Sequence, residues 1–259
     1  MRLIGVVHLP ALPGSPRSEM PLAACIDAAV RDADALAEGG ADGIIIENFN
    51  DSPFRAGAVE AHTVAAMTAA GVAIRAAVNC PIGINVLRND AAAALGIAVA
   101  AGASFIRVNV HTGAMLTDQG IIAGRADDTL RLRRLLGAEH IQIFADVLVK
   151  HAVNLGPLTL VDAVKDAVER GMADAVIVTG GATGSPASVS DVGAAVGASK
   201  APVYVGSGVS VETVRQMVPP SAGVIVGTWL KQDGIVTNPV DVARVRQLRN
   251  ALDECIARA

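Results

Sequence analysis

Eight short apolar runs of β-strand type recur along the chain, and a segment with helical character follows each of them. The runs lie at residues 3–8, 43–47, 81–86, 104–110, 141–147, 175–179, 203–205 and 223–226. Parallel strands need crossover connections of this kind, and eight repeats favour closure of the sheet into a barrel. The chain has 259 residues, close to the length of about 250 that is common for such barrels. The sequence therefore predicts that residues 1–259 form a single (β/α)8, or TIM, barrel domain.

An open, doubly wound sheet is the alternative architecture for alternating strands and helices. Dinucleotide-binding sheets of that type carry a GxGxxG motif in the first loop after a strand. Here the first run is followed by PALPGSP at residues 10–16, which has no such motif. This difference favours the barrel.

The composition suits a buried parallel sheet. Hydrophobic residues make up 52% of the chain and aromatic residues only 2%, so the core consists mainly of Ala, Val, Ile and Leu. The net charge is −4 and the basic residues are scattered, so nucleic acid is not an expected partner. No apolar stretch approaches the roughly 18 residues of a membrane span, so none is expected.

The cysteines indicate the compartment. Cys25, Cys80 and Cys255 lie far apart and form no CxxC pair, which is typical of reduced thiols in a cytoplasmic protein. The sequence is also compatible with assembly into a homo-oligomer.

Small residues end the last two strand-like runs. The seventh run stops at Gly206, Ser207 and Gly208, and the eighth stops at Gly227 and Thr228. In (β/α)8 barrels the loops after strands seven and eight commonly bind phosphate, and glycine leaves backbone N–H groups accessible to the anion. We therefore expect these residues to bind a phosphorylated small molecule, although tight turns alone would also account for the glycines.

Polar side chains gather where the other strand-like runs end. Because all parallel strands of a barrel end on one face, these side chains are expected to surround one site. The candidates for acid–base chemistry are Glu47 and Asp146, acting with His8 or His111. The candidates for substrate binding are Asn48, Asn85, Arg107, Asn109, Lys150 and Thr179.

Each of these residues has a structural alternative. A histidine or asparagine at a strand end often only ties a loop, and Arg107 can point either inward, to balance the carboxylates, or outward beneath a helix. A carboxylate that directly follows an apolar run must be paired or functional, which makes Glu47 and Asp146 stronger candidates. No HxH or HExxH spacing occurs, so neither a metal nor another cofactor is expected.

Residues 111–124 interrupt the regular pattern. The segment carries Gly113, Gly120 and Gly124 and shows neither a helical nor a strand period. Long irregular loops in compact domains are commonly functional, so we expect a binding loop or a lid here.

Two patterns in the polar segments are specific. They are ENF-x-D-x-PF, which starts at Glu47, and VNV-x-TG-x-x-x-TDQG, which starts at Val108. Together with IGVVHLPALPGSP near the start, ADVLVKHA at residues 145–152, TGGATG at 179–184 and IVGTWLKQDG at 225–234, they resemble the BtpA family. Asn50 and Asn154 depart from that family's usual Gly and Pro.

The BtpA family is named for a role in photosystem I biogenesis. The resemblance implies a (β/α)8 barrel with a phosphate-type site, and it leaves the reaction open. One hypothesis is an enzyme acting on a phosphorylated sugar- or nucleoside-type molecule, as an isomerase, a lyase or a glycosidic-bond hydrolase. The alternative is a non-catalytic assembly or stability factor.

Overall fold

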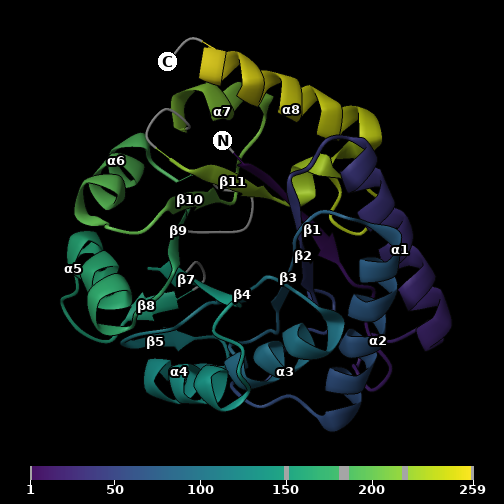
Figure 1. Ribbon diagram of the computed structural model, residues 1–259, viewed down its shortest axis with the longest axis horizontal. Coiled ribbons are helices and arrows are strands. Elements are labelled where there is room, and N and C mark those ends of the chain that lie inside the picture. Colours follow the sequence, from purple (N-terminus) through teal and green to yellow (C-terminus); the bar gives the residue numbers. More distant parts are fainter. Residues whose placement is uncertain (1, 149–151, 181–186, 218–220, 258–259) are drawn as a thin grey trace.

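A closed barrel of parallel strands forms the centre of the molecule, and helices surround it (Figure 1). The strand order around the barrel is β1-β11-β10-β9-β7-β4-β3-β2. The structure is a computed structural model and describes residues 2–148, 152–180, 187–217 and 221–257. It confirms the predicted (β/α)8 barrel, whose strands are β1 (Arg2–His8), β2 (Gly43–Glu47), β3 (Ile82–Asn85), β4 (Phe105–Val108), β7 (Gln142–Val147), β9 (Ala175–Thr179), β10 (Val203–Gly206) and β11 (Gly223–Val226).

Helices follow the barrel strands and pack outside them. Within the described residues, no helix is both long and apolar enough to span a membrane. Short helical turns occur after β11, at Thr228–Leu230 and Gln232–Gly234, and a π-helical turn at Asp166–Arg170 extends α5. The helices are α1 (Leu22–Glu38), α2 (Ala61–Ala77), α3 (Ala91–Ala101), α4 (Ala126–Leu135), α5 (Leu160–Lys165), α6 (Val189–Ala198), α7 (Val211–Met217) and α8 (Val242–Ala257).

Local sequence signals set both ends of α3. The Asp90 carboxylate accepts a hydrogen bond from the Ala93 amide and caps α3. The same helix ends at Gly102, whose φ of 65° lies in the left-handed region that glycine adopts without strain. These caps fix where the chain leaves one helix and enters the next strand.

The interior of the barrel follows the two-residue period of the strands. Alternate residues point inward, and the ones nearest the amino ends of the strands are apolar. Phe105, Phe144 and Tyr204 form an aromatic layer with ring centroids 4.6 Å and 5.0 Å apart. Gly83 on β3 makes room for the Phe105 ring, since a Cβ there would lie 2.2 Å from that ring.

The inward positions nearest the carboxyl ends of the strands are polar. His8, Glu47 and Asn85 lie side by side, because β1, β2 and β3 pair in that register. Arg107 and Asp146 stand on β4 and β7, each two residues beyond an inward-facing phenylalanine. A polar layer therefore sits on an aromatic layer, and the candidate site begins where the apolar core ends.

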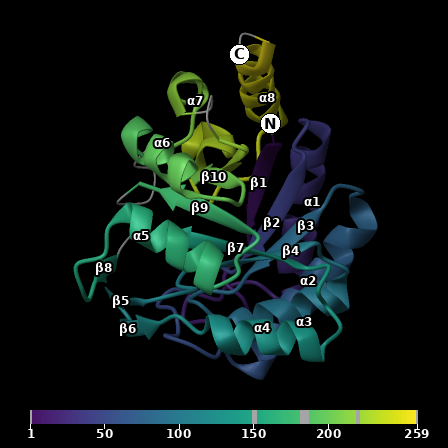
Figure 2. The same ribbon diagram turned by 60° about the vertical axis from the view of Figure 1, so that its left-hand side comes forward.

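The expectation of an irregular segment at residues 111–124 is wrong. Strands β5 (Ala114–Thr117) and β6 (Gly120–Ala123) form an antiparallel hairpin, and β8 (Ala152–Asn154) pairs with β5. Met115 and Ile122 are buried on the inner face of this small sheet. The alternation of buried and exposed residues along these strands is too short to be recognised in the sequence. Figure 2 shows the sheet projecting at one side of the barrel beside α4 and α5.

The aromatic layer generates a stability prediction. Replacing Gly83 by Ala places a methyl group against a Phe105 ring that is already stacked on Phe144, so we expect a loss of about 1–3 kcal/mol in the free energy of unfolding. Gly96 in α3 is the matched control, because a Cβ there meets no atom within 4 Å. Gly96→Ala should be neutral or stabilising by up to about 1 kcal/mol. Urea unfolding measures both, and equal effects would contradict the tight layer.

Candidate active site

A cavity of about 390 Å³ opens at the carboxyl ends of the strands. Such a volume lies within the range of about 300–1,000 Å³ that is usual for small-molecule sites. The wall formed by β2 and β4 carries Glu47 and Arg107, and the wall formed by the loops after β10 and β11 carries small residues. His8 from β1 also lines the cavity. The expected residues in the second wall are Ser207, Gly208, Gly227 and Thr228.

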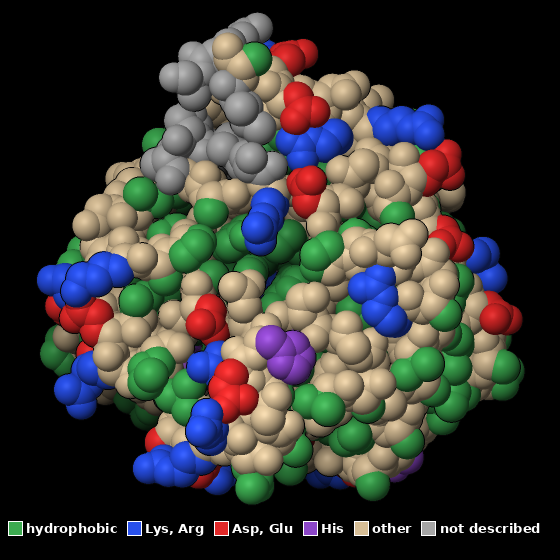
Figure 3. Space-filling view, in the orientation of Figure 1, with side chains coloured by type: hydrophobic (Ala, Val, Ile, Leu, Met, Phe, Trp, Pro, Cys, Tyr) green, Lys and Arg blue, Asp and Glu red, His purple; other side chains and the backbone are tan. Residues whose placement is uncertain are grey.

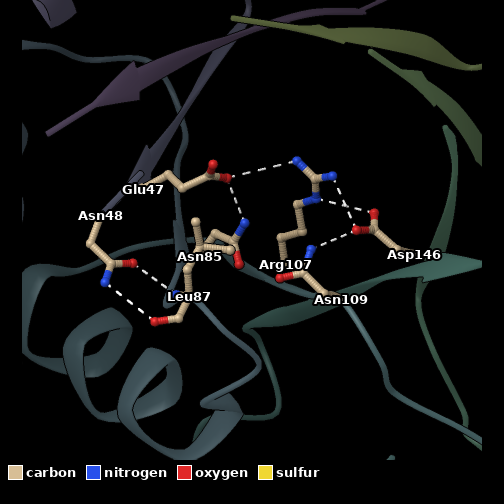
Figure 4. A network of polar contacts seen from close by, with 7 residues as sticks. All are labelled: Glu47, Asn48, Asn85, Leu87, Arg107, Asn109 and Asp146. Carbon is tan, nitrogen blue, oxygen red and sulfur yellow. Dashed lines mark hydrogen bonds and ion pairs between the residues drawn. The ribbon is translucent and has the colours of Figure 1, made fainter. Parts of the chain in front are cut away.

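Arg107 is the centre of a buried polar network at the base of this cavity (Figure 4). Its Nε and Nη2 atoms donate to the two carboxylate oxygens of Asp146, each at 3.1 Å. The amide of Asn109 donates to the same carboxylate at 2.7 Å. The choice left open by the sequence is thus resolved, because Arg107 points inward and forms a forked pair with Asp146.

Glu47 completes the network on the other side of Arg107. Its Oε2 accepts a hydrogen bond of 2.6 Å from the amide of Asn85 and lies 3.9 Å from Nη1 of Arg107. Burial lowers the pKa of the Arg107 guanidinium, but the nearby carboxylates of Asp146 and Glu47 have the larger effect. The pKa is therefore raised above its ordinary value. Arg107 therefore stays charged and holds both acids in place.

The two carboxylates differ in access. The Asp146 side chain is 0% exposed, and donors from Arg107 and Asn109 occupy both of its oxygens. The Glu47 side chain is 9% exposed and lines the cavity. The sequence predicts the same acid–base role for both acids. In the structure, of these two only Glu47 contacts the space that a ligand would fill.

The loop after β10 opens with two residues in the left-handed backbone region. Ser207 and Gly208 both adopt positive φ, at 66° and 62°. The next helix, α7, is capped by Ser210, whose Oγ accepts from the Thr213 amide at 3.3 Å, while the Ser210 amide donates to Oγ1 of Thr213 at 2.9 Å. The helix end is thus partly occupied by its own cap, so an anion here would depend on the loop amides rather than on the helix.

Gly227 has a steric role that the sequence does not reveal. A Cβ at this position would lie 2.6 Å from Cε1 and 2.9 Å from Nε2 of His8. The His8 ring also packs against Phe49, with ring centroids 4.6 Å apart. Glycine at 227 therefore lets His8 lie directly against the loop that is expected to bind phosphate.

His111 lies away from the cavity. The sequence predicts it among the acid–base groups that surround the cavity. The ring is 1% exposed, and its Nε2 forms a hydrogen bond of 2.8 Å with the carbonyl oxygen of Gly171. Because a carbonyl only accepts, Nε2 carries the proton. Burial lowers the pKa of His111, an effect that the Gly171 carbonyl and Asp174 oppose and Arg133 reinforces. His111 therefore does not line the cavity, and its acid–base role stays a prediction.

The other expected binding residues have varied surroundings. Asn48 uses its side chain on the backbone of Leu87, accepting from the amide at 2.8 Å and donating to the carbonyl at 3.3 Å, so it ties two loops together. Gly206 is buried at the end of β10, and Thr179 lies beside it at the end of β9. Neither lines the cavity. Lys150 lies outside the described residues.

Two residues near the site are not predicted from the sequence, Arg88 and Trp229. Arg88 is 7% exposed and donates to Asp118 in the β5–β6 turn at 3.4 Å. Burial lowers its pKa, and the carboxylates of Asp118, Asp146 and Glu47 counteract this. Trp229, the single tryptophan of the chain, lines the cavity, and the guanidinium of Arg244 lies 4.4 Å from its ring centroid. A lone tryptophan directly after a strand-end Gly-Thr is a signal that could have identified it.

The chain belongs to the BtpA family, whose profile matches residues 1–254. It is 48% identical over 253 residues to the photosystem I biogenesis protein BtpA of a Synechocystis species, with coverage of 97% of this chain and 88% of that protein. An uncharacterized protein of Pyrococcus furiosus is 47% identical over 253 residues, covering 96% and 95%. An uncharacterized mitochondrial protein of Caenorhabditis elegans is 34% identical over 250 residues, covering 94% and 90%. The family resemblance found in the sequence is confirmed.

Solved structures share the barrel at low sequence identity. A thiamine phosphate pyrophosphorylase from Pyrococcus furiosus superposes with a TM-score of 0.61 at 14% identity, covering 98% of this chain and 96% of that one. A phosphoribosyl anthranilate isomerase from Thermus thermophilus gives a TM-score of 0.58 at 11% identity, covering 98% and 99%. These similarities support the fold.

The buried network predicts strong coupling between Arg107 and Asp146. Arg107→Met leaves two buried carboxylates without their cation, and we expect it to lower the free energy of unfolding by about 3–5 kcal/mol. Adding Asp146→Leu removes one of those carboxylates, so the double variant should lose clearly less than the sum of the single ones. Urea unfolding of the four proteins gives the coupling energy. Strict additivity would show that the pair does not interact.

His111 predicts a pH dependence of stability. The unfolded chain takes up a proton on this histidine at about pH 6.5, whereas the buried ring resists it. Below this pH the unfolded state binds more protons than the folded state. The contribution of His111 to the free energy of unfolding is therefore fully present above about pH 6.5 and is lost as the pH falls below that value. His111→Gln should flatten this slope between about pH 6.5 and 5, while replacement of the exposed His140 by Gln controls for loss of a surface histidine. An unchanged slope in His111→Gln would refute the assignment.

Proposed function

We propose that this BtpA-family barrel is an enzyme that acts on a phosphorylated small molecule of sugar or nucleoside type. The observation that supports it is the cavity itself. One wall consists of the strand-end loops at Gly208 and Gly227, which suit a phosphate, and the other presents Glu47 and Arg107. An ester bound by its phosphate in these loops would place its remaining atoms against a carboxylate and a guanidinium.

The geometry divides the chemical work among the residues. Glu47 contacts the cavity and is the candidate for proton transfer. Arg107 supplies fixed positive charge for an anion that develops on the substrate. Asp146 is fully buried against Arg107 and acts as a positioning residue, which revises the acid–base role expected from the sequence. His8 lies against Gly227 and is placed to assist at the phosphate end. Proton transfer of this kind serves an isomerase, a lyase or a glycosidic-bond hydrolase.

The names of the structural neighbours agree with this proposal. Thiamine phosphate pyrophosphorylase and phosphoribosyl anthranilate isomerase are both named for phosphorylated compounds, and both are barrels of this shape. At 14% and 11% identity they carry no residue assignments, so the proposal depends on this chain's own cavity.

The Synechocystis relative favours a second candidate function. Its name, photosystem I biogenesis protein, suggests a non-catalytic assembly factor, and the identity of 48% makes a shared role reasonable. Relatives in Pyrococcus and Caenorhabditis, which do not photosynthesise, argue that the family's common activity is a different one. A barrel kept only for assembly would not need the cavity residues for its function.

The phosphate site is tested by thermal unfolding with inorganic phosphate. A ligand that binds only the folded protein raises the melting temperature, so phosphate should raise that of the parent. Gly208→Asp introduces a negative charge at the loop and should abolish the rise. Gly137→Asp is the matched control, because both glycines have a φ of 62° and only Gly208 lines the cavity. A rise that persists in Gly208→Asp would place the anion elsewhere.

The role of Glu47 is tested with a substrate found by screening phosphorylated metabolites for the same thermal shift. Glu47→Gln keeps the shape of the side chain and its contact with Asn85, but it cannot transfer a proton. We expect kcat to fall by about 10²-fold or more while the dissociation constant of the ligand stays within a few fold. Turnover and calorimetric binding measure the two quantities. Full activity in Glu47→Gln would refute the proposed chemistry.

A further inference from the structure

A second cavity adjoins the first and has no role in the proposed chemistry. Its volume is about 720 Å³, and the loops after β1 and β11 line it together with α1. Figure 1 shows α1 beside β1 and close to the segment that leads into α8. His8 belongs to the linings of both cavities, so this residue lies between the two spaces.

The charged groups of the second cavity favour an anion. Arg17 and Arg31 both line it, and in the described part of the chain neither guanidinium takes part in an ion pair or hydrogen bond. Glu19 also lines the cavity and is likewise unpaired among the described residues. Lys231 and Asp32 neutralise each other through an ion pair. The positive charges of the two arginines therefore exceed the negative charge of Glu19, and the lining has a net positive charge.

The rest of the lining is largely apolar. Apart from the imidazole of His8, no aromatic side chain contributes to it, so most of the surface that a ligand would contact is aliphatic. Such a surface binds an apolar body, and the arginines bind a carboxylate or similar group attached to it. The apolar residues include Pro10, Ala11, Met20, Ala28, Val236 and Pro239.

One wall of this cavity is held in place by a buried ion pair. Lys231 is 1% exposed and pairs with Asp32 of α1. The second oxygen of Asp32 accepts a hydrogen bond of 2.8 Å from the Val240 amide. The segment between residues 231 and 240 is thus fastened to α1 at both of its ends, so the cavity is formed before any ligand arrives.

We propose that the second cavity is a binding subsite for the part of the substrate remote from its phosphate. That part is an apolar body with a negatively charged group, which Arg17 and Arg31 bind, and His8 lies between the two halves. The link to the phosphate rests on the proposed function, whereas the affinity of this cavity for apolar anions does not.

The experiment is calorimetric titration with 2-naphthoate, an apolar two-ring body that carries one carboxylate. The parent should bind it, and the double variant Arg17→Gln with Arg31→Gln should bind it roughly tenfold more weakly or worse, because charged hydrogen bonds are lost. The neutral analogue 2-naphthalenemethanol should bind the parent and this variant equally weakly. Saturating inorganic phosphate should leave 2-naphthoate bound, since the anions occupy different cavities.

Two control variants make the outcomes decisive. Gly208→Asp should still bind 2-naphthoate, so failure of the phosphate site is distinguishable from failure of this subsite. Ile121→Thr with Val153→Thr removes apolar side chains exposed on the outer face of the small sheet, 63% and 68% exposed, and should leave affinity unchanged. Equal affinity in the parent and the arginine double variant, displacement by phosphate, or weakening by the sheet variant would each overturn the proposal.

Discussion

The site depends on one buried cation. Arg107 stands inside the barrel between Asp146 and Glu47, and without it two carboxylates would face each other in an apolar surrounding. Burial of an unpaired charge costs several kcal/mol, so the guanidinium is what allows acids at this depth. Asp146 fixes its orientation, Asn109 donates a hydrogen bond to Asp146, and Asn85 fixes the orientation of Glu47. The network keeps one carboxylate fully enclosed and presents the other to the cavity.

The layer beneath explains why the network stays at one level. Phe105, Phe144 and Tyr204 fill the barrel below it, and Gly83 opposite Phe105 leaves room for the Phe105 ring. In a chain with so few aromatic residues, three of them occupy this layer. The aromatic layer packs closely below the polar groups, and Gly208 and Gly227 line the opposite wall of the cavity above them.

Much of this arrangement could be predicted from the sequence. His8, Glu47, Asn85 and Asp146 lie on a common face because they stand at strand ends and the parallel strands of a barrel all end on one side. The small residues after β10 and β11 line the cavity. The surface charges are also intermingled, as scattered basic residues predict, on the face that Figure 3 shows.

What the sequence could not supply are the contacts between distant segments. The partner of Arg107 is 39 residues away, and only the closed barrel brings them together. His111 follows a strand as the other candidates do, but the chain turns outward before it and its ring meets Gly171 instead. The hairpin of β5 and β6 is stabilised by β8, a partner more than thirty residues further along the chain. Lys231 is buried because Asp32 lies opposite it on α1, which no local pattern indicates.

We infer that the mouth of this barrel binds a phosphate ester between the strand-end glycine loops and the Glu47–Arg107 wall. The most direct measurement is a crystal structure of the protein grown with inorganic phosphate. We expect the anion within hydrogen-bonding distance, about 2.7–3.2 Å, of the backbone amides of Gly208 and Thr228. A well-ordered phosphate bound elsewhere, with this loop pair left empty, would contradict it.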